Sequence, residues 1–350
     1  MAGQTRLAIE GERFLLNDAP TYPGRTYRDW PIEGLLLNVR AVNAIFDDLN
    51  PETRDRWSYP DTGRWEPERN VRELCEQLPV WREHGLLAVT VNLQGGSPEG
   101  YSKRQPWQNS GFTPVGTLRH DYLVRLERVL DTADRLGMVV ILGLFYFGQD
   151  ERLSDERAVT RAVDSTVEWL LEQGRANVII EIDNECDVPR YEHEILQPHR
   201  VHELIERVRG ISGAGGRRLL VSTSYRGGSI PSERVLAVAD LALVHANGVT
   251  DPAVMAWLIE QTRRRLGTRR IPIVVNEDDH FDFDRPWNNM LAAISRYASW
   301  GFFDAGPGSG GAGARGDYVE GYQNVPVNWG INTPTKRAFF ALLREITGDR

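Results

Sequence analysis

The chain has 350 residues, of which 41% are hydrophobic and 26% are charged, a composition typical of ordinary globular proteins. Its formal net charge of −8 argues against a nucleic-acid partner or an anionic membrane surface, because both require a basic face. The two cysteines, Cys75 and Cys186, form no CxxC pair, so the sequence indicates neither a disulfide framework nor a structural zinc site.

Nothing in the sequence suggests a membrane or secretory segment. Residues 1–14 lack the apolar core of a secretory signal, and no apolar run approaches the roughly 20 residues needed to cross a bilayer. We therefore expect a cytoplasmic protein. The oligomeric state cannot be deduced from the sequence.

Apolar runs of strand length recur along the chain. In residues 7–16, short apolar pieces flank Gly11 and Glu12, a pattern that predicts a β-hairpin. We expect this hairpin to close one end of the structure that the later residues form. Eight further runs predict buried strands at 34–40, 86–94, 138–147, 178–185, 218–225, 241–246, 271–277 and 299–305.

Helical patterns separate these runs. The i, i+3, i+4, i+7 spacing of apolar residues is clear at 71–81, 123–133 and 159–170. Weaker versions predict helices at 196–209, 252–265, 286–298 and 336–346, with a short one at 234–239. Eight strand–helix alternations predict a (β/α)₈ barrel of parallel strands. An open doubly wound sheet is the alternative, although no glycine-rich phosphate motif follows the first strand.

The connections differ in length at the two ends of the predicted barrel. Helix-to-strand turns are short, whereas the connections at 43–70, 95–120 and 306–335 are long and rich in Trp, Tyr, Pro and Gly. Such barrels keep their sites at the strand carboxyl ends, where these long connections lie. The glycine-rich stretch 306–316 is expected to be a mobile loop of this set. We expect 1–350 to form one catalytic domain, with 1–30 as hairpin and lead-in.

Two carboxylates occupy the ends of predicted strands. Glu185 ends the fourth strand in VIIEIDNECD (178–187), and Glu277 ends the seventh in IPIVVNEDDH (271–280). Strands four and seven of an eight-stranded barrel face each other across the mouth, so two acids there can flank one scissile bond. Glycoside cleavage by double displacement needs one protonated carboxyl and one ionised carboxylate. Asn184 is placed to hydrogen-bond a sugar hydroxyl.

These two segments resemble those of a known group of enzymes. VIIEIDNE is similar to the strand-four motif of glycoside hydrolase clan A, especially the family 5 cellulase-like enzymes, and PIVVNE (272–277) resembles the strand that carries their nucleophile. The resemblance implies a retaining glycosidase with Glu185 as general acid/base, Glu277 as nucleophile and no cofactor or metal. Glu181 matches the acidic residue within the strand.

The sequence also departs from that pattern. Cys186 replaces the usual proline after the acid, while Asp278 and Asp279 follow the nucleophile where a small or aromatic residue is commoner. The clan is therefore better supported than the family, and substrate specificity does not carry over. We expect a carbohydrate substrate, namely a small glycoside or an oligosaccharide.

Other polar and aromatic residues lie at predicted strand ends or in the long connections. Polar side chains at the ends of buried strands are costly to bury without hydrogen-bond partners, which favours a role in binding substrate. The candidates for binding substrate are Asn38, Arg40, Asn92, Tyr146, Tyr225, His245 and Trp329, with Gln94, Gln149 and Ser224 nearby. Residues with equally good structural explanations are Asp47, Asp48, Trp65, Trp107 and Trp287.

Two other functions remain possible from the sequence. A metal-dependent barrel hydrolase could draw ligands from Asp183, Asp187, Asp278, Asp279 and His280, although most strand ends lack the histidines that zinc catalysis uses. A non-catalytic carbohydrate-binding barrel is the other possibility, but such a module has no use for two opposed carboxylates.

Overall fold

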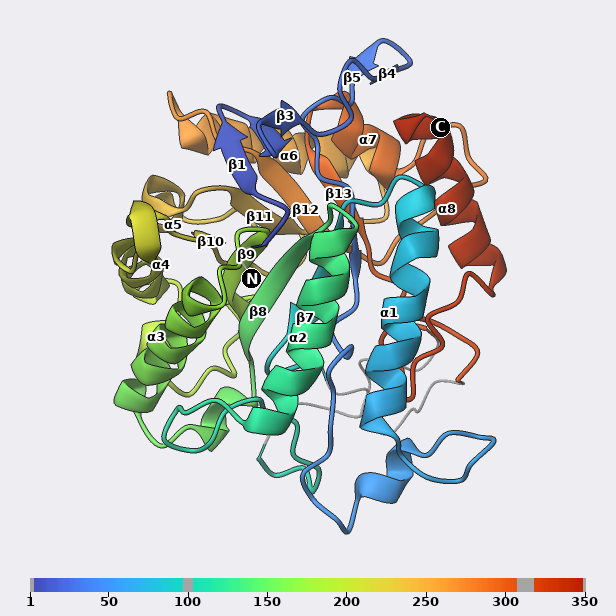
Figure 1. Cartoon of the computed structure of the whole chain (residues 1–350). Helices are drawn as coiled ribbons and strands as arrows, with labels where there is room; N and C mark the ends of the chain where they lie inside the picture. Colours follow the sequence, from blue (N-terminus) through green and yellow to red (C-terminus); the bar gives the residue numbers. More distant parts are fainter. Residues whose placement is uncertain (1–2, 97–102, 307–317, 349–350) are drawn as a thin grey trace.

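The computed structural model describes residues 3–96, 103–306 and 318–348, which fold as a barrel of parallel strands surrounded by helices (Figure 1). The first barrel strand pairs with both the second and the last, so the sheet returns upon itself. This confirms the predicted (β/α)₈ barrel against an open sheet. Its strands are β6 (Asn38–Arg40), β7 (Ala88–Asn92), β8 (Val139–Tyr146), β9 (Val178–Asn184), β10 (Leu220–Ser222), β11 (Ala242–His245), β12 (Ile273–Asp278) and β13 (Ser299–Phe302).

The sheet has one seam. In the order β10-β9-β8-β7-β6-β13-β12-β11, the strands β10 and β11 are its two ends. Three hydrogen bonds join β10 to the residues that lead into β11: Ser222 Oγ donates to the Leu241 carbonyl at 2.7 Å, the Asp240 N–H donates to the Val221 carbonyl at 3.0 Å, and the Val221 N–H donates to Asp240 Oδ2 at 3.0 Å. Side-chain hydrogen bonds thus replace part of the backbone ladder that joins the other barrel strands.

The helices follow the predicted order. They are α1 (Pro67–Glu83), α2 (His120–Arg135), α3 (Glu156–Glu172), α4 (Val201–Gly210), α5 (Glu233–Val238), α6 (Pro252–Leu266), α7 (Asn289–Ser295) and α8 (Pro334–Thr347), with 3₁₀ turns η1 (Arg54–Trp57), η2 (Asp150–Arg152), η3 (Glu194–Leu196) and η4 (Ala214–Gly216). No described helix is long and apolar enough to cross a membrane.

The helix predicted over 286–298 is shorter than expected. The Asn288 side chain accepts from the Leu291 N–H and caps α7 only there, while Tyr297 has a φ of 51° that stops the helix before β13. The glycine-rich stretch predicted as a mobile loop lies, from residue 307 onward, outside the described residues.

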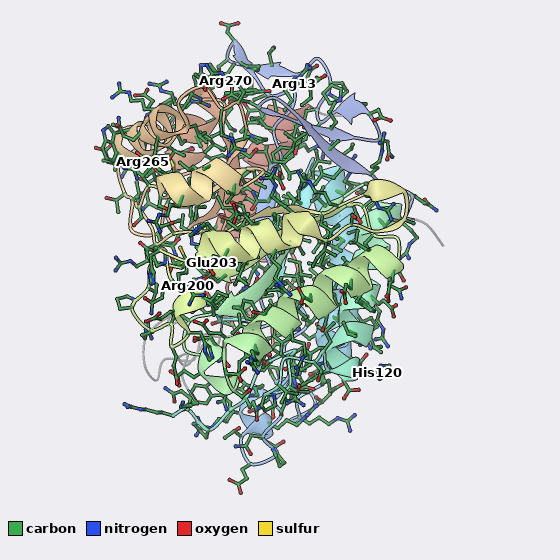
Figure 2. The ribbon with its side chains drawn as sticks, turned by 90° about the vertical axis from the view of Figure 1, so that its left-hand side faces the viewer. Arg13, His120, Arg200, Glu203, Arg265 and Arg270 are labelled. Atoms are coloured by element: carbon green, nitrogen blue, oxygen red, sulfur yellow. The ribbon has the colours of Figure 1, made fainter. Side chains whose placement is uncertain are left out.

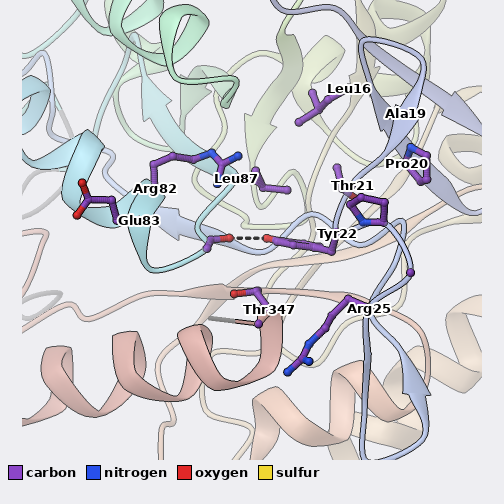
Figure 3. Close-up of a pocket in the computed structure, with 14 residues that line it drawn as sticks. Leu16, Ala19, Pro20, Thr21, Tyr22, Arg25, Arg82, Glu83, Leu87 and Thr347 are labelled. Atoms are coloured by element: carbon purple, nitrogen blue, oxygen red, sulfur yellow. Dashed lines mark hydrogen bonds between the residues drawn. The ribbon is translucent and has the colours of Figure 1, made fainter. Parts of the chain in front are cut away.

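An N-terminal hairpin closes one end of the barrel. Its strands are β1 (Leu7–Glu10), β2 (Arg13–Leu16) and β3 (Ala19–Pro20), followed by the pair β4 (Thr26–Tyr27) and β5 (Trp30–Pro31). Phe14 is fully buried among the first residues of the barrel strands, which agrees with the predicted position of the hairpin at one end of the structure. Nearby, a cavity of 560 Å³ lies between the lead-in and the ends of α1 and α8, where the Tyr22 hydroxyl donates to the Gly85 carbonyl at 2.8 Å (Figure 3).

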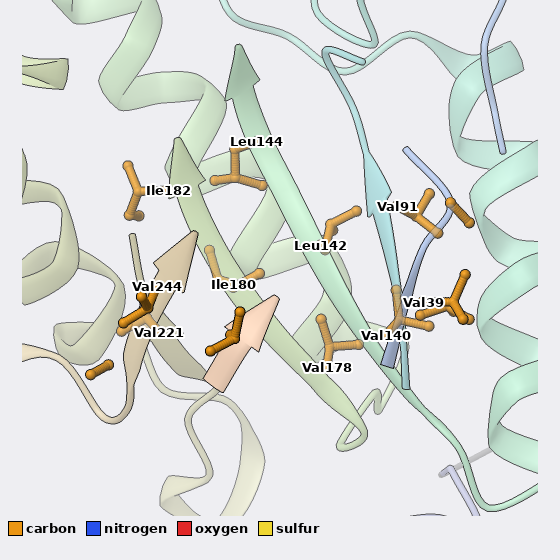
Figure 4. Close-up of a cluster of buried hydrophobic side chains, with 14 of the residues drawn as sticks. Val39, Val91, Val140, Leu142, Leu144, Val178, Ile180, Ile182, Val221 and Val244 are labelled. Atoms are coloured by element: carbon orange, nitrogen blue, oxygen red, sulfur yellow. The ribbon is translucent and has the colours of Figure 1, made fainter. Parts of the chain in front are cut away.

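The two faces of the barrel strands differ in chemistry. Alternate residues face the helices and form the main core, which includes Val39, Val91, Val140, Ile180 and Val244 (Figure 4). On the inner face, the residues nearest the hairpin are also apolar. Two residues further along the same inner face, every barrel strand except β11 carries a polar side chain or glycine: Asn38, Thr90, Gly143, Glu181, Ser222, Asn276 and Gly301. We call these seven residues the polar layer, and it lies directly beneath the mouth.

Candidate active site

Glu185 turns into the barrel mouth at the end of β9. Its backbone has a φ of 56°, a left-handed conformation that is unusual for a residue with a long side chain. Two bonds to the segment after β10 hold this turn: the Glu185 N–H donates to Ser224 Oγ at 3.0 Å, and the Cys186 N–H donates to the Ser224 carbonyl at 3.0 Å. Backbone strain of this kind persists where the surroundings fix it, and such places are often functional sites.

Glu277 reaches the mouth through an irregularity in β12. Val244 pairs with Val275, but the next residue of β11, His245, pairs with Glu277, so β12 contains one extra residue at this point. A bulge of this type changes the direction of the side chains that follow it. As a result, Glu277 and His245 are register partners at the carboxyl end of the barrel.

These elements bring three titratable side chains together. One carboxylate oxygen each of Glu185 and Glu277 and one ring nitrogen of His245 lie within 4.8 Å of one another. His245 Nδ1 is 3.1 Å from Oε1 of Glu185 and 3.5 Å from Oε2 of Glu277. Its Nε2 is 3.8 Å from Oε1 of Glu181, one layer deeper in the barrel.

Arg40 supplies a fixed positive charge beside the same oxygen of Glu277 that His245 approaches. Its guanidinium Nε contacts Oε2 of Glu277, its Nη2 donates to Oδ1 of Asn184, and its Nη1 lies 3.7 Å from Oε2 of Glu181. Because this bond engages Oδ1, the Asn184 Nδ2 group is left as a buried donor without a partner in the described chain. Arg40 therefore orients both the carboxylate and the amide.

The surroundings shift the pKa values of the two glutamates in opposite directions. Burial raises the pKa of Glu277 above its ordinary value, even though Arg40 and His245 act in the opposite direction. Burial also acts to raise the pKa of Glu185, but the hydrogen bond and charge of His245 outweigh it, and the net pKa is lowered. The two groups lie close enough to titrate as a pair.

The remaining predicted substrate-binding residues have different positions. Asn38 and Asn92 lie inside the barrel wall, and within the described chain Asn38 Oδ1 and both amide atoms of Asn92 have no hydrogen-bond partner. Tyr146, at the end of β8, lies within range of the charge of Arg40. Tyr225 is buried and its hydroxyl donates to Ser232 Oγ at 2.8 Å, which directs it toward α5.

Trp329 does not join this group. Its indole stacks on Tyr322 with ring centroids 5.9 Å apart and lies edge-on to Trp81. The indole N–H donates to the Asn70 carbonyl at 2.9 Å. Trp329 thus packs the segment after β13 against α1, whereas the sequence analysis named it as a candidate for binding substrate.

The acids and tryptophans of the long connections mainly hold those connections together. Asp47 accepts from the Trp65 indole at 3.0 Å, and Asp48 accepts from the Trp57 indole at 2.9 Å. Trp107 is also buried and lies edge-on to Trp57 at 5.9 Å. Of the two explanations for these residues, the contacts favour the structural one. Trp287 is 40% exposed and lies against Trp30 of β5, at the hairpin end.

The acids proposed as metal ligands do not converge. Asp278 accepts from the Trp300 indole at 2.8 Å, and burial raises its pKa to about 8. Asp279 accepts from the Gly248 N–H at 2.9 Å, and Asp187 accepts from the Arg226 N–H at 2.7 Å. Among the described residues, the set close enough to share an ion is Glu185, His245 and Glu277. There the Arg40 guanidinium already contacts Glu277, which disfavours a divalent cation.

The sequence interpretation missed two residues that hydrogen-bond glutamates of this cluster. Asn247, two residues after β11, donates through Nδ2 to Oε1 of Glu277. Asn276, in the polar layer, donates through Nδ2 to Oε1 of Glu181 at 3.4 Å. An asparagine in a loop is an ordinary turn residue, so only the register of β11 against β12 identifies Asn247 as a partner of the glutamate.

Comparison with known proteins shows similarity of fold without similarity of sequence. No protein-family model matches the chain, and no curated protein matches it. A structure from Bacteroides vulgatus ATCC 8482 aligns over 97% of this chain with a TM-score of 0.56 and 13% identity, and this chain spans 60% of its length.

Two further structures match along nearly their whole length. A family 5 glycoside hydrolase from Prevotella bryantii B14, solved with a xyloglucan tetradecasaccharide, has a TM-score of 0.53 and 11% identity, covering 89% of this chain and 96% of that one. A family 5 mannosidase from Rhizomucor miehei has a TM-score of 0.51 and 14% identity, covering 98% and 97%. The predicted resemblance to the family 5 barrel is thus confirmed at the level of the fold.

Proposed function

We propose that this chain is a retaining glycoside hydrolase in which Glu185 is the general acid/base and Glu277 is the nucleophile. The observation that carries the proposal is the approach of the two carboxylates at the barrel mouth, with an oxygen of each within 4.8 Å of the other. Retaining enzymes hold their carboxyl groups about 5–5.5 Å apart, whereas inverting enzymes need about 6.5–9.5 Å to admit a water.

The hydrogen bonds that orient each carboxylate suit these roles, whereas the directions of the pKa shifts in the substrate-free site, raised for Glu277 and lowered for Glu185, are those of the opposite assignment. Glu277 is oriented by Arg40 on one oxygen and Asn247 on the other, which fixes a nucleophile for attack at the anomeric carbon. Glu185 protonates the leaving oxygen as that bond breaks, and then removes a proton from the water that releases the sugar from Glu277. The free Nδ2 of Asn184 is a donor for a sugar hydroxyl beside the reacting carbon.

We propose small glycosides or oligosaccharides as substrates. The long connections after β6 and β7 are joined to each other, because Asp48 from the first accepts the Gln108 N–H of the second at 2.9 Å. Figure 1 shows these connections gathered at the end of the barrel opposite the hairpin. If these joined connections form a wall beside the barrel mouth, the site favours short ligands or chain ends over a long polymer that lies in an open groove.

The test uses purified wild type and three variants on a panel of nitrophenyl glycosides and oligosaccharides. Glu185→Ala should be slow but rescued by azide, and Glu277→Gly should be almost inactive yet able to use a glycosyl fluoride. The matched control is Asp279→Asn, an exposed acid at the same rim, which should keep wild-type rates. Product stereochemistry by NMR should show retention.

The outcome also separates the alternative functions. Inversion of the anomeric centre, or unchanged turnover in Glu185→Ala, would contradict the assignment. Sugar binding without turnover on any substrate would favour the non-catalytic barrel. Loss of activity on chelation, restored by a divalent metal, would favour the metal-dependent hydrolase.

A further inference from the structure

His245 is enclosed by charged groups from three sides. Glu181 lies on β9 with a carboxylate oxygen 3.8 Å from a ring nitrogen of His245, and Glu185, just after β9, has an oxygen at 3.1 Å. Glu277 lies on β12 with an oxygen at 3.5 Å. From β6 comes the guanidinium of Arg40, which contacts Glu277. The imidazole itself is fully buried, and β11 contributes no other titratable group.

The charge balance of this cluster depends on the imidazole. Three buried carboxylates face one guanidinium, and an unpaired charge in a protein interior is costly. A proton on His245 supplies a second cation at the centre of the three acids. Although burial alone would lower the pKa of His245, the charge of Glu277 and hydrogen bonding to Glu181 and Glu185 raise it to about 9.

We propose that His245 is a permanent imidazolium at neutral pH and acts as a positioning residue that sets the pH range of the Glu185–Glu277 pair. This inference rests on the proposed function for its kinetic consequence, but the charge state of the ring does not depend on it. A fixed cation beside both carboxylates stabilises their ionised forms, so the pair exchanges its protons at lower pH than it otherwise would. The working pH range of the proposed glycosidase is then lower than it would be with a neutral side chain at this position.

The first experiment measures the ring directly in the wild-type protein, without substrate. Histidine labelled with ¹⁵N is followed by NMR from pH 5 to 10, and the His245 signals are identified by their loss in His245→Asn. We expect the doubly protonated ring up to at least pH 8, about 1.5 units above the ordinary histidine pKa of about 6.5. A buried ring that is neutral at pH 7 would overturn the proposal, whether or not the protein cleaves any glycoside.

The second experiment compares pH–rate profiles of kcat/KM. His245→Asn keeps a donor near Glu185 but removes the charge, and both limbs of its profile should move to higher pH by about 1 to 3 units. His120→Asn is the control, because His120 is exposed at the first residue of α2, on the outer surface (Figure 2). Its profile should coincide with that of wild type.

The result distinguishes positioning from mere packing. A lower rate in His245→Asn with both limbs unmoved would assign the ring a structural role only and contradict the proposal. If that variant does not fold, Glu181→Gln provides the same test. Loss of the Glu181 charge should lower the pH at which the His245 ring loses its proton, and an unchanged titration would refute the electrostatic argument.

Discussion

Replacing Arg40 with methionine removes a buried guanidinium from the barrel mouth. The wild-type side chain is 1% exposed, contacts Glu277 and lies 3.7 Å from Glu181, so the variant leaves two buried carboxylates short of a partner. Breaking a buried ion pair from one side costs about 3–5 kcal/mol, because the remaining charge stays desolvated. We expect the free energy of unfolding at pH 7 to fall by that amount.

The loss should depend on pH. Without Arg40, the pKa values of Glu181 and Glu277 rise in the folded state, so the penalty grows as pH rises above the unfolded value of about 4.3. In wild type, Arg40 helps lower the pKa of Glu181 against burial, and that stabilisation is present above the unfolded value and disappears as pH falls. Both effects make the difference between the proteins smaller at pH 5 than at pH 7.

Urea denaturation at the two pH values measures this difference. The control is Arg207→Met, since Arg207 is 46% exposed in its pair with Asp164 and such pairs contribute at most about 1 kcal/mol. An equal loss for Arg40→Met at pH 5 and pH 7 would refute the electrostatic reasoning, because a packing defect alone would not change with pH.

Two further substitutions test the site from different directions. A methyl group on Gly301 would lie 2.2 Å from Asn38 Oδ1 in the polar layer, so Gly301→Ala should lower the free energy of unfolding by about 1–3 kcal/mol in a urea titration. Gly210 has open space around it, so Gly210→Ala should leave the free energy of unfolding unchanged. Equal stability of the two variants would contradict the packing argument. Asn247→Ala removes a hydrogen bond to the Glu277 carboxylate. Because hydrogen bonds to charged groups contribute about 1.5–3 kcal/mol, kcat/KM should fall about 10- to 150-fold. A fall of less than about threefold would show that Asn247 does not orient the nucleophile.

The fold was predictable because each level of the sequence agreed with the next. Buried strands such as 138–147 are continuous apolar runs, and glycines such as Gly137 and Gly174, which both adopt positive φ, end the helices before them. The helix over 286–298 was predicted too long because its apolar residues fit the period, while the cap at Asn288 is a local hydrogen bond that periodicity does not measure.

The site was predictable only in part. Glu185 and Glu277 could be identified because they end strands, and strand order fixes which ends face each other. Asn247 could not, because its contact depends on an extra residue in β12 that shifts the register by one. The packing of Trp329 against α1 also depends on how a long connection folds back, which the sequence pattern does not determine.

The seam of the barrel has a mechanical consequence. Ser224, which holds the backbone turn of Glu185, follows β10, while His245 ends β11, so the two sides of the joint carry different parts of one constellation. Elsewhere in the barrel neighbouring strands are paired directly with each other, but this joint depends on the hydrogen bonds of Ser222 and Asp240. We expect local opening of the barrel wall to begin at this joint, and such an opening would move the acid away from its imidazole.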